Sequence, residues 1–268
     1  MKRTINLYAL VSLTLGFMLA SCSSTKETTE PDAAKLKVTK PLTSTFKFLS
    51  INTLHQLQDS AEVKKFARWV NSTGAEVVAI QQIERATETK PGFDAVAKLA
   101  RQLDMRSFFG KARYFKGWDS GNALFSSYPI NQTQLYQLPV GKGKVRRSLA
   151  FGLVDLGLKQ LGFCSTELDD ENLTERMKQA SEISSVTESL KDYPVVVAGN
   201  FGETAEGKTV ETMIKKFSLV NTVNDETKNI NEHVYIPING KLKIVSAEKL
   251  QYAAFHSTGV LVTIEIIQ

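Results

Sequence analysis

Short apolar runs alternate with segments of helical periodicity from about residue 46 onward. Runs of about four to eight apolar or β-branched residues predict strands, whereas apolar residues three and four positions apart predict helices. The predicted strands are 46–52, 75–84, 121–130, 148–156, 159–168, 195–200, 233–238, 241–250 and 260–266. Helices are predicted near 59–73, at 93–103, near 170–190 and at 208–217.

The first predicted helix shows how strongly its ends are marked. Asp59 and Glu62 form a capping box, and Gly74 follows the last helical position. Roughly ten strands with few helices between them are more than a single layer can bury, so the pattern favours an α/β sandwich. We expect one folded domain over residues 45–268.

The amino terminus has a pattern of its own. Lys2 and Arg3 precede an apolar run, and Leu19-Ala20-Ser21-Cys22 closes that run with small residues before a cysteine. This resembles a bacterial lipobox, which predicts a signal peptide over 1–21 and a lipidated Cys22. An ordinary signal peptide or a membrane anchor is the alternative, but the apolar run is short for a span.

Residues 22–44 contain no aromatic residue and no apolar periodicity, and they are predicted to be a flexible tether between lipid and domain. A lipobox implies an outer-membrane lipoprotein of the bacterial cell envelope, whose partner through Cys22 is the membrane. Loss of Lys2 and Arg3 would lower the formal net charge from +5 to +3, which by itself does not favour nucleic acid as a partner. The second cysteine, Cys164, has no partner left in the chain, which excludes a disulfide framework.

Eight short motifs follow one another in a recognisable order: FLSIN, AIQQIE, GNALFSSYPI, STEL, ERMKQA, GNFG, HVYI and AFH. This order resembles the endonuclease/exonuclease/phosphatase superfamily. The resemblance implies the DNase I-like fold, a four-layer α/β sandwich of two packed, mostly antiparallel sheets with helices outside. It also implies Mg²⁺-dependent hydrolysis of phosphodiesters or phosphomonoesters.

Most family positions that carry charge are substituted in this chain. Gln82 stands where the family has its metal-binding Glu, Asn200 and Gly202 replace the Asp and Asn of Gly-Asp-x-Asn, and Glu167 replaces a His. Val234 replaces the Asp that precedes a Tyr, and Phe255 replaces the Asp beside the final His256. Asn52, Asn122, Thr166, Arg176 and Gln179 match the family pattern.

These substitutions predict a domain without the family activity. Mg²⁺ binds carboxylate oxygens, and a catalytic His depends on a carboxylate that orients it. We therefore expect a pseudoenzyme, most simply a monomer without a cofactor, that binds an unknown protein or an anionic ligand. Mg²⁺ would be the cofactor if activity were retained.

A displaced metal site is the alternative that keeps hydrolysis. Glu84 follows Gln82 by two residues, and Glu167, Asp169 and Asp170 cluster after another strand, so a metal site could be rebuilt from Glu84, Glu167 and Asp169. The simpler interpretation is a solvated loop whose aspartates cap the next helix.

A basic segment lies between two predicted strands. Lys142, Lys144, Arg146 and Arg147 could hold a phosphate backbone or an anionic headgroup. The simpler interpretation is a solvated hairpin turn in which Gly141 and Gly143 make the bend.

Overall fold

The computed structural model describes residues 44–86, 92–157, 159–222 and 225–267. The predicted signal peptide, Cys22 and the tether lie outside these residues. In the described part of the chain, no helix is both long enough and apolar enough to span a membrane.

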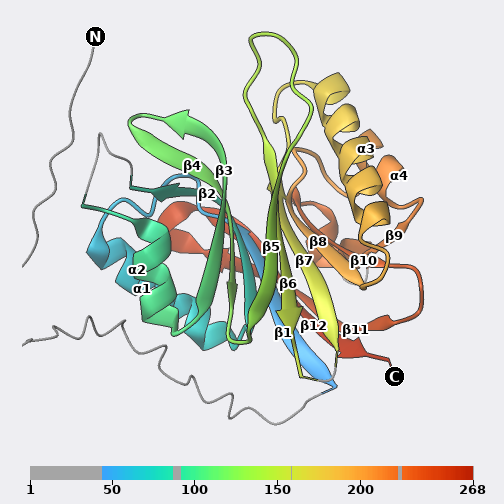
Figure 1. The fold of residues 1–268 in the computed structure, drawn as a ribbon, viewed down its shortest axis with the longest axis horizontal. Coiled ribbons are helices and arrows are strands. Elements are labelled where there is room, and N and C mark those ends of the chain that lie inside the picture. The colour runs from blue at the N-terminus through green and yellow to red at the C-terminus, as the bar shows by residue number, and fades with distance from the viewer. Residues whose placement is uncertain (1–43, 87–91, 158, 223–224, 268) are drawn as a thin grey trace, which may run out of the picture. The chain divides into compact units, whose positions relative to one another are not determined.

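The described strands form two six-stranded sheets (Figure 1). The first has the order β11-β12-β1-β2-β4-β3, with bounds Leu242–Tyr252, Ser257–Ile266, Thr45–Asn52, Val77–Arg85, Trp118–Ser126 and Arg106–Phe115. The second has the order β5-β6-β7-β8-β10-β9, with bounds Ile130–Gln137, Ser148–Asp155, Gln160–Glu167, Val195–Asn200, Glu232–Pro237 and Phe217–Leu219. Neighbours are antiparallel except for the parallel pairs β1–β2 and β7–β8.

Helices cover the outer face of each sheet (Figure 1). Helices α1 (Ser60–Thr73) and α2 (Ala95–Leu103) pack on the first sheet, and α3 (Leu173–Ser189) and α4 (Lys208–Met213) pack on the second. The short helices are α5 (Asp225–Lys228), η1 (Val220–Thr222) and η2 (Ala253–Phe255). The four-layer α/β sandwich expected from the resemblance is confirmed.

Three apolar cores separate the four layers. The middle core joins the sheets through contacts such as the Phe48 and Phe163 rings, whose centroids are 5.4 Å apart. One outer core packs Phe66 of α1 and Leu99 of α2 against the first sheet, and the other packs Ile183 of α3 against the second. A strand buried on both faces reads as a continuous apolar run, which is the pattern that predicted the central strands.

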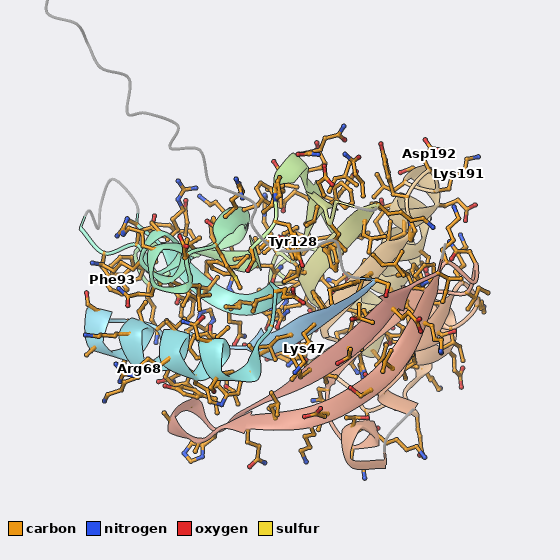
Figure 2. All side chains as sticks on the ribbon, turned by 90° about the horizontal axis from the view of Figure 1, so that it is seen from below. Lys47, Arg68, Phe93, Tyr128, Lys191 and Asp192 are labelled. Atoms are coloured by element: carbon orange, nitrogen blue, oxygen red, sulfur yellow. The ribbon has the colours of Figure 1, made fainter. Side chains whose placement is uncertain are left out.

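The Asp59 half of the capping box predicted for the first helix is present, whereas the Glu62 side chain accepts from the Gln58 N–H at 3.1 Å and not from that of Asp59. Asp59 accepts hydrogen bonds from the backbone N–H groups of Ala61 and Glu62, and Gly74 ends α1 in the left-handed conformation with φ 70°. Arg68 lies on the outer face of α1 (Figure 2). Because the apolar stripe of α1 is fixed on the sheet, the loop between β1 and α1 is held at the edge where β1 ends.

Three strands, β3, β5 and β9, were not predicted. Each is the outermost strand of its sheet, so it buries less surface and carries more polar side chains than a central strand. The helix predicted at 208–217 ends at Met213, and Phe217 begins β9 and packs into the core beneath α3 and α4.

Candidate functional site

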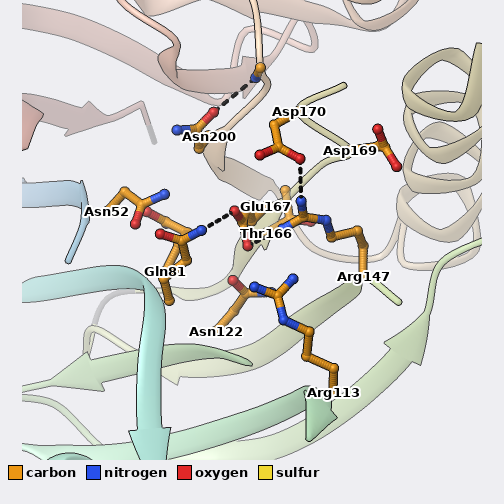
Figure 3. A network of polar contacts seen from close by, with 12 residues as sticks. Asn52, Gln81, Arg113, Asn122, Arg147, Thr166, Glu167, Asp169, Asp170 and Asn200 are labelled. Atoms are coloured by element: carbon orange, nitrogen blue, oxygen red, sulfur yellow. Dashed lines mark hydrogen bonds and ion pairs between the residues drawn. The ribbon is translucent and has the colours of Figure 1, made fainter. Parts of the chain in front are cut away.

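The strand ends that carry the family motifs meet at one edge of the two packed sheets (Figure 3). Asn52 at the end of β1 pairs with Gln81 of β2, and Glu167 at the end of β7 pairs with Asn200 of β8. Gln82 links the two sheets, since its side-chain amide donates a hydrogen bond to Glu167 Oε1 at 2.6 Å. The sequence therefore located the edge of the fold at which these residues come together.

A β-bulge in β2 decides which way its glutamines point. The pairing with β4 shifts between Ile80 and Ile83, and Gln82 has the left-handed φ of 52°. Gln81 is buried and donates to Ser50 Oγ and Ser165 Oγ at 3.3 and 3.2 Å. The bulge turns the Gln82 side chain toward Glu167 at the end of β7, while Gln81 contacts Ser165 deeper between the sheets.

Arg147 places its guanidinium in the middle of this edge, between Glu167 and Asp170 (Figure 3). Its side chain is only 3% exposed; Nη1 forms an ion pair with Glu167 Oε2, and Nη2 lies 2.8 Å from Asp170 Oδ1. With Gln82 on the other oxygen, both oxygens of Glu167 are occupied by donors of the protein itself. Arg113 lies close enough for Glu167 to oppose the desolvation that lowers the pKa of this arginine.

The asparagine side chains of the site form hydrogen bonds with nearby backbone groups. Asn52 Oδ1 accepts from the Leu54 N–H, and Asn200 Oδ1 accepts from the Gly202 N–H, both at 2.9 Å. Asn122 Nδ2 donates to the Ser148 carbonyl at 2.8 Å. These bonds are of the kind that asparagine makes at turns and strand ends, so they hold the edge in shape without a bound ligand.

Positions that would carry carboxylates in the family are part of the core here. Val234 lies between the sheets, and Phe255 stacks on Phe66 beneath α1 with ring centroids 5.8 Å apart. Gly202 adopts φ 71°, and a Cβ built there would lie 2.9 Å from Arg176 Cδ. An asparagine at this position would therefore collide with the arginine that now fills the space.

Matching helix residues have structural roles. Gln179 is fully buried and joins two loops by accepting from the Asp169 N–H at 2.9 Å and donating to the Pro139 carbonyl at 3.2 Å. Arg176 donates to the Asp169 carbonyl at 3.0 Å. Thr166 donates to the same Ser148 carbonyl that Asn122 contacts.

Glu232 is a carboxyl group at this edge that the sequence did not single out. It opens β10 opposite Asn200, is 3% exposed, and accepts a hydrogen bond from Ser50 Oγ. Burial raises its pKa from 4.5 to about 8, against the lowering effect of Ser50. Because Glu232 lies two residues before Val234, strand alternation could have indicated that it faces the other sheet.

Beside Glu232 lies a cavity of about 320 Å³. It is lined by Glu232, His256, Asn52, Asn200 and neighbouring residues of the loop before β10. His256 is exposed and has a left-handed φ of 52° at the end of η2. The edge thus contains a hollow with one buried acid and one imidazole on its wall.

None of the known protein-family models matches this sequence, and no curated protein is significantly similar to it in sequence. Solved structures do match. The endonuclease/exonuclease/phosphatase from Beutenbergia cavernae has a TM-score of 0.67 and 16% identity, covering 83% of this chain and 72% of its own. The human Nocturnin catalytic domain with bound sulfate matches with a TM-score of 0.68 and 12% identity, over 83% of this chain and 94% of that one.

A Bacteroides thetaiotaomicron mannosyl-6-phosphatase also matches, with a TM-score of 0.60 and 11% identity over 83% of this chain and 100% of that one. The described domain has the endonuclease/exonuclease/phosphatase fold. At such low identity the likeness concerns the fold alone. What this DNase I-like edge can do must be argued from its own side chains.

The residues at the edge do not fit the divalent cation that the fold implies. A hard cation needs several free oxygen ligands, preferably carboxylates. Here the amide NH₂ of Gln82 and the guanidinium of Arg147 occupy Glu167, and within the described ranges no three His, Cys, Asp or Glu side chains are grouped to hold a metal. The cation that Glu167 contacts is the guanidinium of Arg147.

The displaced metal site considered from the sequence is not assembled. Glu84 forms an ion pair with His55, and Asp169 accepts from the Glu171 and Asn172 N–H groups at 3.0 and 2.7 Å. The bulge at Gln82 breaks the strict alternation on which the grouping of Glu84 with Gln82 depended. Glu84, Glu167 and Asp169 therefore have three separate sets of partners.

The basic segment of the DNase I-like domain divides into two parts. Lys142, Lys144 and Arg146 are exposed, whereas Arg147 is buried in the ion pairs described above. The preceding loop is held by Glu175, which accepts from the Gly141 N–H at 2.8 Å. The three exposed cations remain a candidate surface for an anionic ligand.

Proposed function

We propose that this protein is a lipid-anchored, non-catalytic member of the DNase I-like fold that binds a ligand or partner at the bacterial cell envelope. The observation that carries the proposal is the Arg147 guanidinium, buried and paired with Glu167 at the edge where the fold's motifs converge. The lipobox that ends at Cys22 supports the anchor.

Each requirement of phosphoester hydrolysis is opposed by a specific side chain. A buried guanidinium repels a divalent cation, and Gln82 presents an amide donor where a carboxylate would be needed. Phe255 is packed in the core and gives His256 no carboxylate to fix its tautomer. In the serine proteases, loss of the carboxylate that orients the catalytic histidine costs about 10⁴ in rate.

A hydrolysis assay on the purified mature chain tests the proposal. DNA, RNA, sphingomyelin and inositol phosphates are incubated with Mg²⁺ or Mn²⁺, and metal binding is measured by isothermal titration. We expect no turnover above buffer and no stoichiometric metal binding. Metal-dependent turnover that His256→Ala abolishes would refute the non-catalytic role.

A weakened hydrolase is the second candidate, and Glu232 is the observation that favours it. Glu232 and His256 line one cavity, and a carboxyl with a pKa of about 8 can exchange a proton near neutral pH. If turnover is found, Glu232→Gln should reduce it at least about 100-fold, the lower range for a general acid or base. Turnover unaffected by Glu232→Gln would exclude this candidate.

A further inference from the structure

A second cavity, of about 290 Å³, lies between the loop after β1, the end of β2 and the β3–β4 hairpin. Its wall includes the rings of Phe93, Phe115 and Trp118 together with His55, Glu84 and Lys116. Among them only Glu84 belongs to one of the motifs that mark the fold, the segment AIQQIE. The cavity is nevertheless separate from the one beside Glu232, because the two share no lining residue.

The hairpin places two aromatic rings side by side on this wall. Phe115 and Trp118 are directly paired across β3 and β4, joined by the two residues Lys116 and Gly117 with φ of 49° and 93°. Phe93, just before α2 (Figure 2), meets Trp118 edge-on, with ring centroids 6.2 Å apart and an interplanar angle of 86°. All three rings are half-buried, so each retains surface toward the cavity.

Glu84 makes part of the cavity wall polar, and one of its carboxylate oxygens lacks a hydrogen-bond donor among the described residues. Its side chain is buried, Oε1 contacts His55 Nδ1, and Oε2 has no hydrogen-bond partner among the described residues. A buried acceptor left without a donor costs about 1–3 kcal/mol. Because Glu84 lines the cavity but Oε2 itself has almost no accessible surface, a ligand O–H or N–H group recovers that cost through a small rotation of the carboxylate.

The backbone around the cavity is held in uncommon conformations. Leu54, His55 and Lys116 all have left-handed φ, at 50°, 60° and 49°. Such non-glycine residues cost about 1–2 kcal/mol each and tend to occur where a structure positions functional groups. Here they position the His55 ring, which stacks on Phe115 at 4.4 Å between ring centroids.

We infer that this cavity binds a sugar ring. A pyranose has an apolar face that packs on an indole, and hydroxyls that both donate and accept. Those hydroxyls suit the acceptor of Glu84 and the ammonium of Lys116 at once. The cavity volume suits one substituted ring, near the lower end of the range for small-molecule sites.

A nucleobase fits the wall less well than a sugar. Phe93 is perpendicular to Trp118, and His55 already stacks on Phe115, so no pair of parallel rings is open to sandwich a flat base. The inference names the ligand for the binding role proposed above, and it rests on that role.

Tryptophan fluorescence of the full mature chain tests the inference, because Trp69 and Trp118 are the two tryptophans of the sequence. Glucose, mannose, galactose and N-acetylglucosamine are titrated against the protein, with adenosine and guanosine as a second arm. We expect a saturable change with at least one sugar. Trp69 packs against Phe66 and Tyr252 and does not line this cavity. The fluorescence change should therefore persist in the Trp69→Phe variant.

Variants then assign the binding to the cavity. Trp118→Ala and Glu84→Gln should each weaken sugar binding about tenfold or more in calorimetric titrations, whereas Arg68→Ala, on the exposed face of α1, should leave it unchanged. Circular dichroism verifies folding, and Glu84→Gln alone decides if Trp118→Ala does not fold. Absence of sugar binding, preference for nucleosides, or binding unchanged in the folded variants would overturn the inference.

The two proposals fail in different ways. A chain that hydrolyses phosphoesters but still binds sugar through Trp118 and Glu84 refutes only the non-catalytic role. A chain that neither hydrolyses phosphoesters nor binds sugar refutes only the sugar site.

Discussion

Arg147 is a charged side chain that is almost entirely buried, and its effect on the stability of the fold depends on its ion pair with Glu167. Taking both groups out of water carries a desolvation penalty that their mutual attraction roughly offsets. Removal of one partner leaves the other charge buried without compensation. The pair is therefore expected to add little net stability to the fold.

Removing the guanidinium of Arg147 should destabilise the fold strongly. We expect Arg147→Ala to lower the free energy of unfolding by about 3–5 kcal/mol, because the carboxylate of Glu167 stays buried without its partner. The measurement is urea unfolding followed by circular dichroism. Arg146→Ala, which alters an exposed neighbour, should change stability by no more than about 0.5 kcal/mol.

A double variant separates charge from packing. Arg147→Met with Glu167→Leu removes both charges and should recover most of the loss, because an apolar pair replaces the ion pair at similar volume. A double variant as unstable as Arg147→Ala would contradict this account of the site.

Glu232 should make stability depend on pH in a defined direction. Its pKa is 4.5 unfolded and about 8 folded, so the folded state holds the proton more tightly. Stability contributed by the proton is full below pH 4.5 and declines as pH rises to 8, by at most about 1.4 kcal/mol per pH unit. Glu232→Gln should remove this decline, so its stability relative to wild type should increase from pH 5 to 8 in urea titrations.

His233 has the opposite dependence and sets the window for that test. Burial lowers its pKa from 6.5 to about 4, so the stability of the neutral ring is gained as pH rises from 4 to 6.5. Above pH 6.5 the Glu232 effect is isolated from that of His233. Equal slopes for wild type and Glu232→Gln between pH 6.5 and 8 would contradict the assignment.

At this scale the sequence located the substituted motif positions but not their new partners. Gln82, Glu167 and Asn200 were placed at one edge because each ends a strand with a characteristic motif. The burial of Arg147 could not be predicted, since three exposed basic residues precede it and its partners lie in another strand and loop. Such pairing is a long-range property that local patterns do not encode.

Among the secondary-structure elements, prediction succeeded for the central strands and missed three of the four outermost strands of the two described sheets, β11 being the one that was found. Central strands such as β6 and β8 are almost wholly buried and were found as apolar runs. Strand β5 carries polar residues on most positions, because one of its edges faces solvent. Its alignment is set by pairing with β6, information that lies outside its own sequence.

The contact between β7 and β8 depends on one glycine. Gly199 has φ 149°, and a Cβ there would lie 1.7 Å from the Thr166 carbonyl oxygen. We expect Gly199→Ala to cost about 4 kcal/mol or more, or to prevent folding, because neither backbone can move without breaking the parallel pair. Gly143→Ala has φ 75° but open space around it, so it should cost only about 1–2 kcal/mol in thermal unfolding. Similar losses of stability in Gly199→Ala and Gly143→Ala would show that the strain of a positive φ, and not the close contact between β7 and β8, accounts for the effect at Gly199.

For the whole molecule, the lipobox predicts where the domain resides. We expect wild type to associate with membranes on fractionation and to be released by detergent, and Cys22→Ser to lose this association because it blocks lipidation. Mass spectrometry of the amino-terminal peptide verifies the modification. Cys164→Ala is the matched control, because Cys164 is fully buried and cannot carry a lipid. Membrane association that survives Cys22→Ser would exclude the proposed anchor.

The substituted family positions lie on both sheets, so restoring single positions should not create a metal site. Phe255→Asp would bury an unpaired charge in the core beneath α1, and Gly202→Asn would collide with Arg176. We therefore expect that reinstating all four family residues, with Gln82→Glu and Asn200→Asp, yields an unstable protein without Mg²⁺-dependent hydrolysis.

Removing the Arg147 guanidinium should favour Mg²⁺ binding more than adding carboxylates does. Gln82→Glu with Asn200→Asp leaves Arg147 to neutralise the new charge, so isothermal titration should show no Mg²⁺ binding. Adding Arg147→Ala places three carboxylates at one edge without the guanidinium that is paired with Glu167, and Mg²⁺ should then bind and raise the unfolding temperature. Adding Arg146→Ala instead removes the same charge from an exposed position and should give no such binding. Mg²⁺ binding by the variant that retains Arg147 would show that this arginine is not what closes the site.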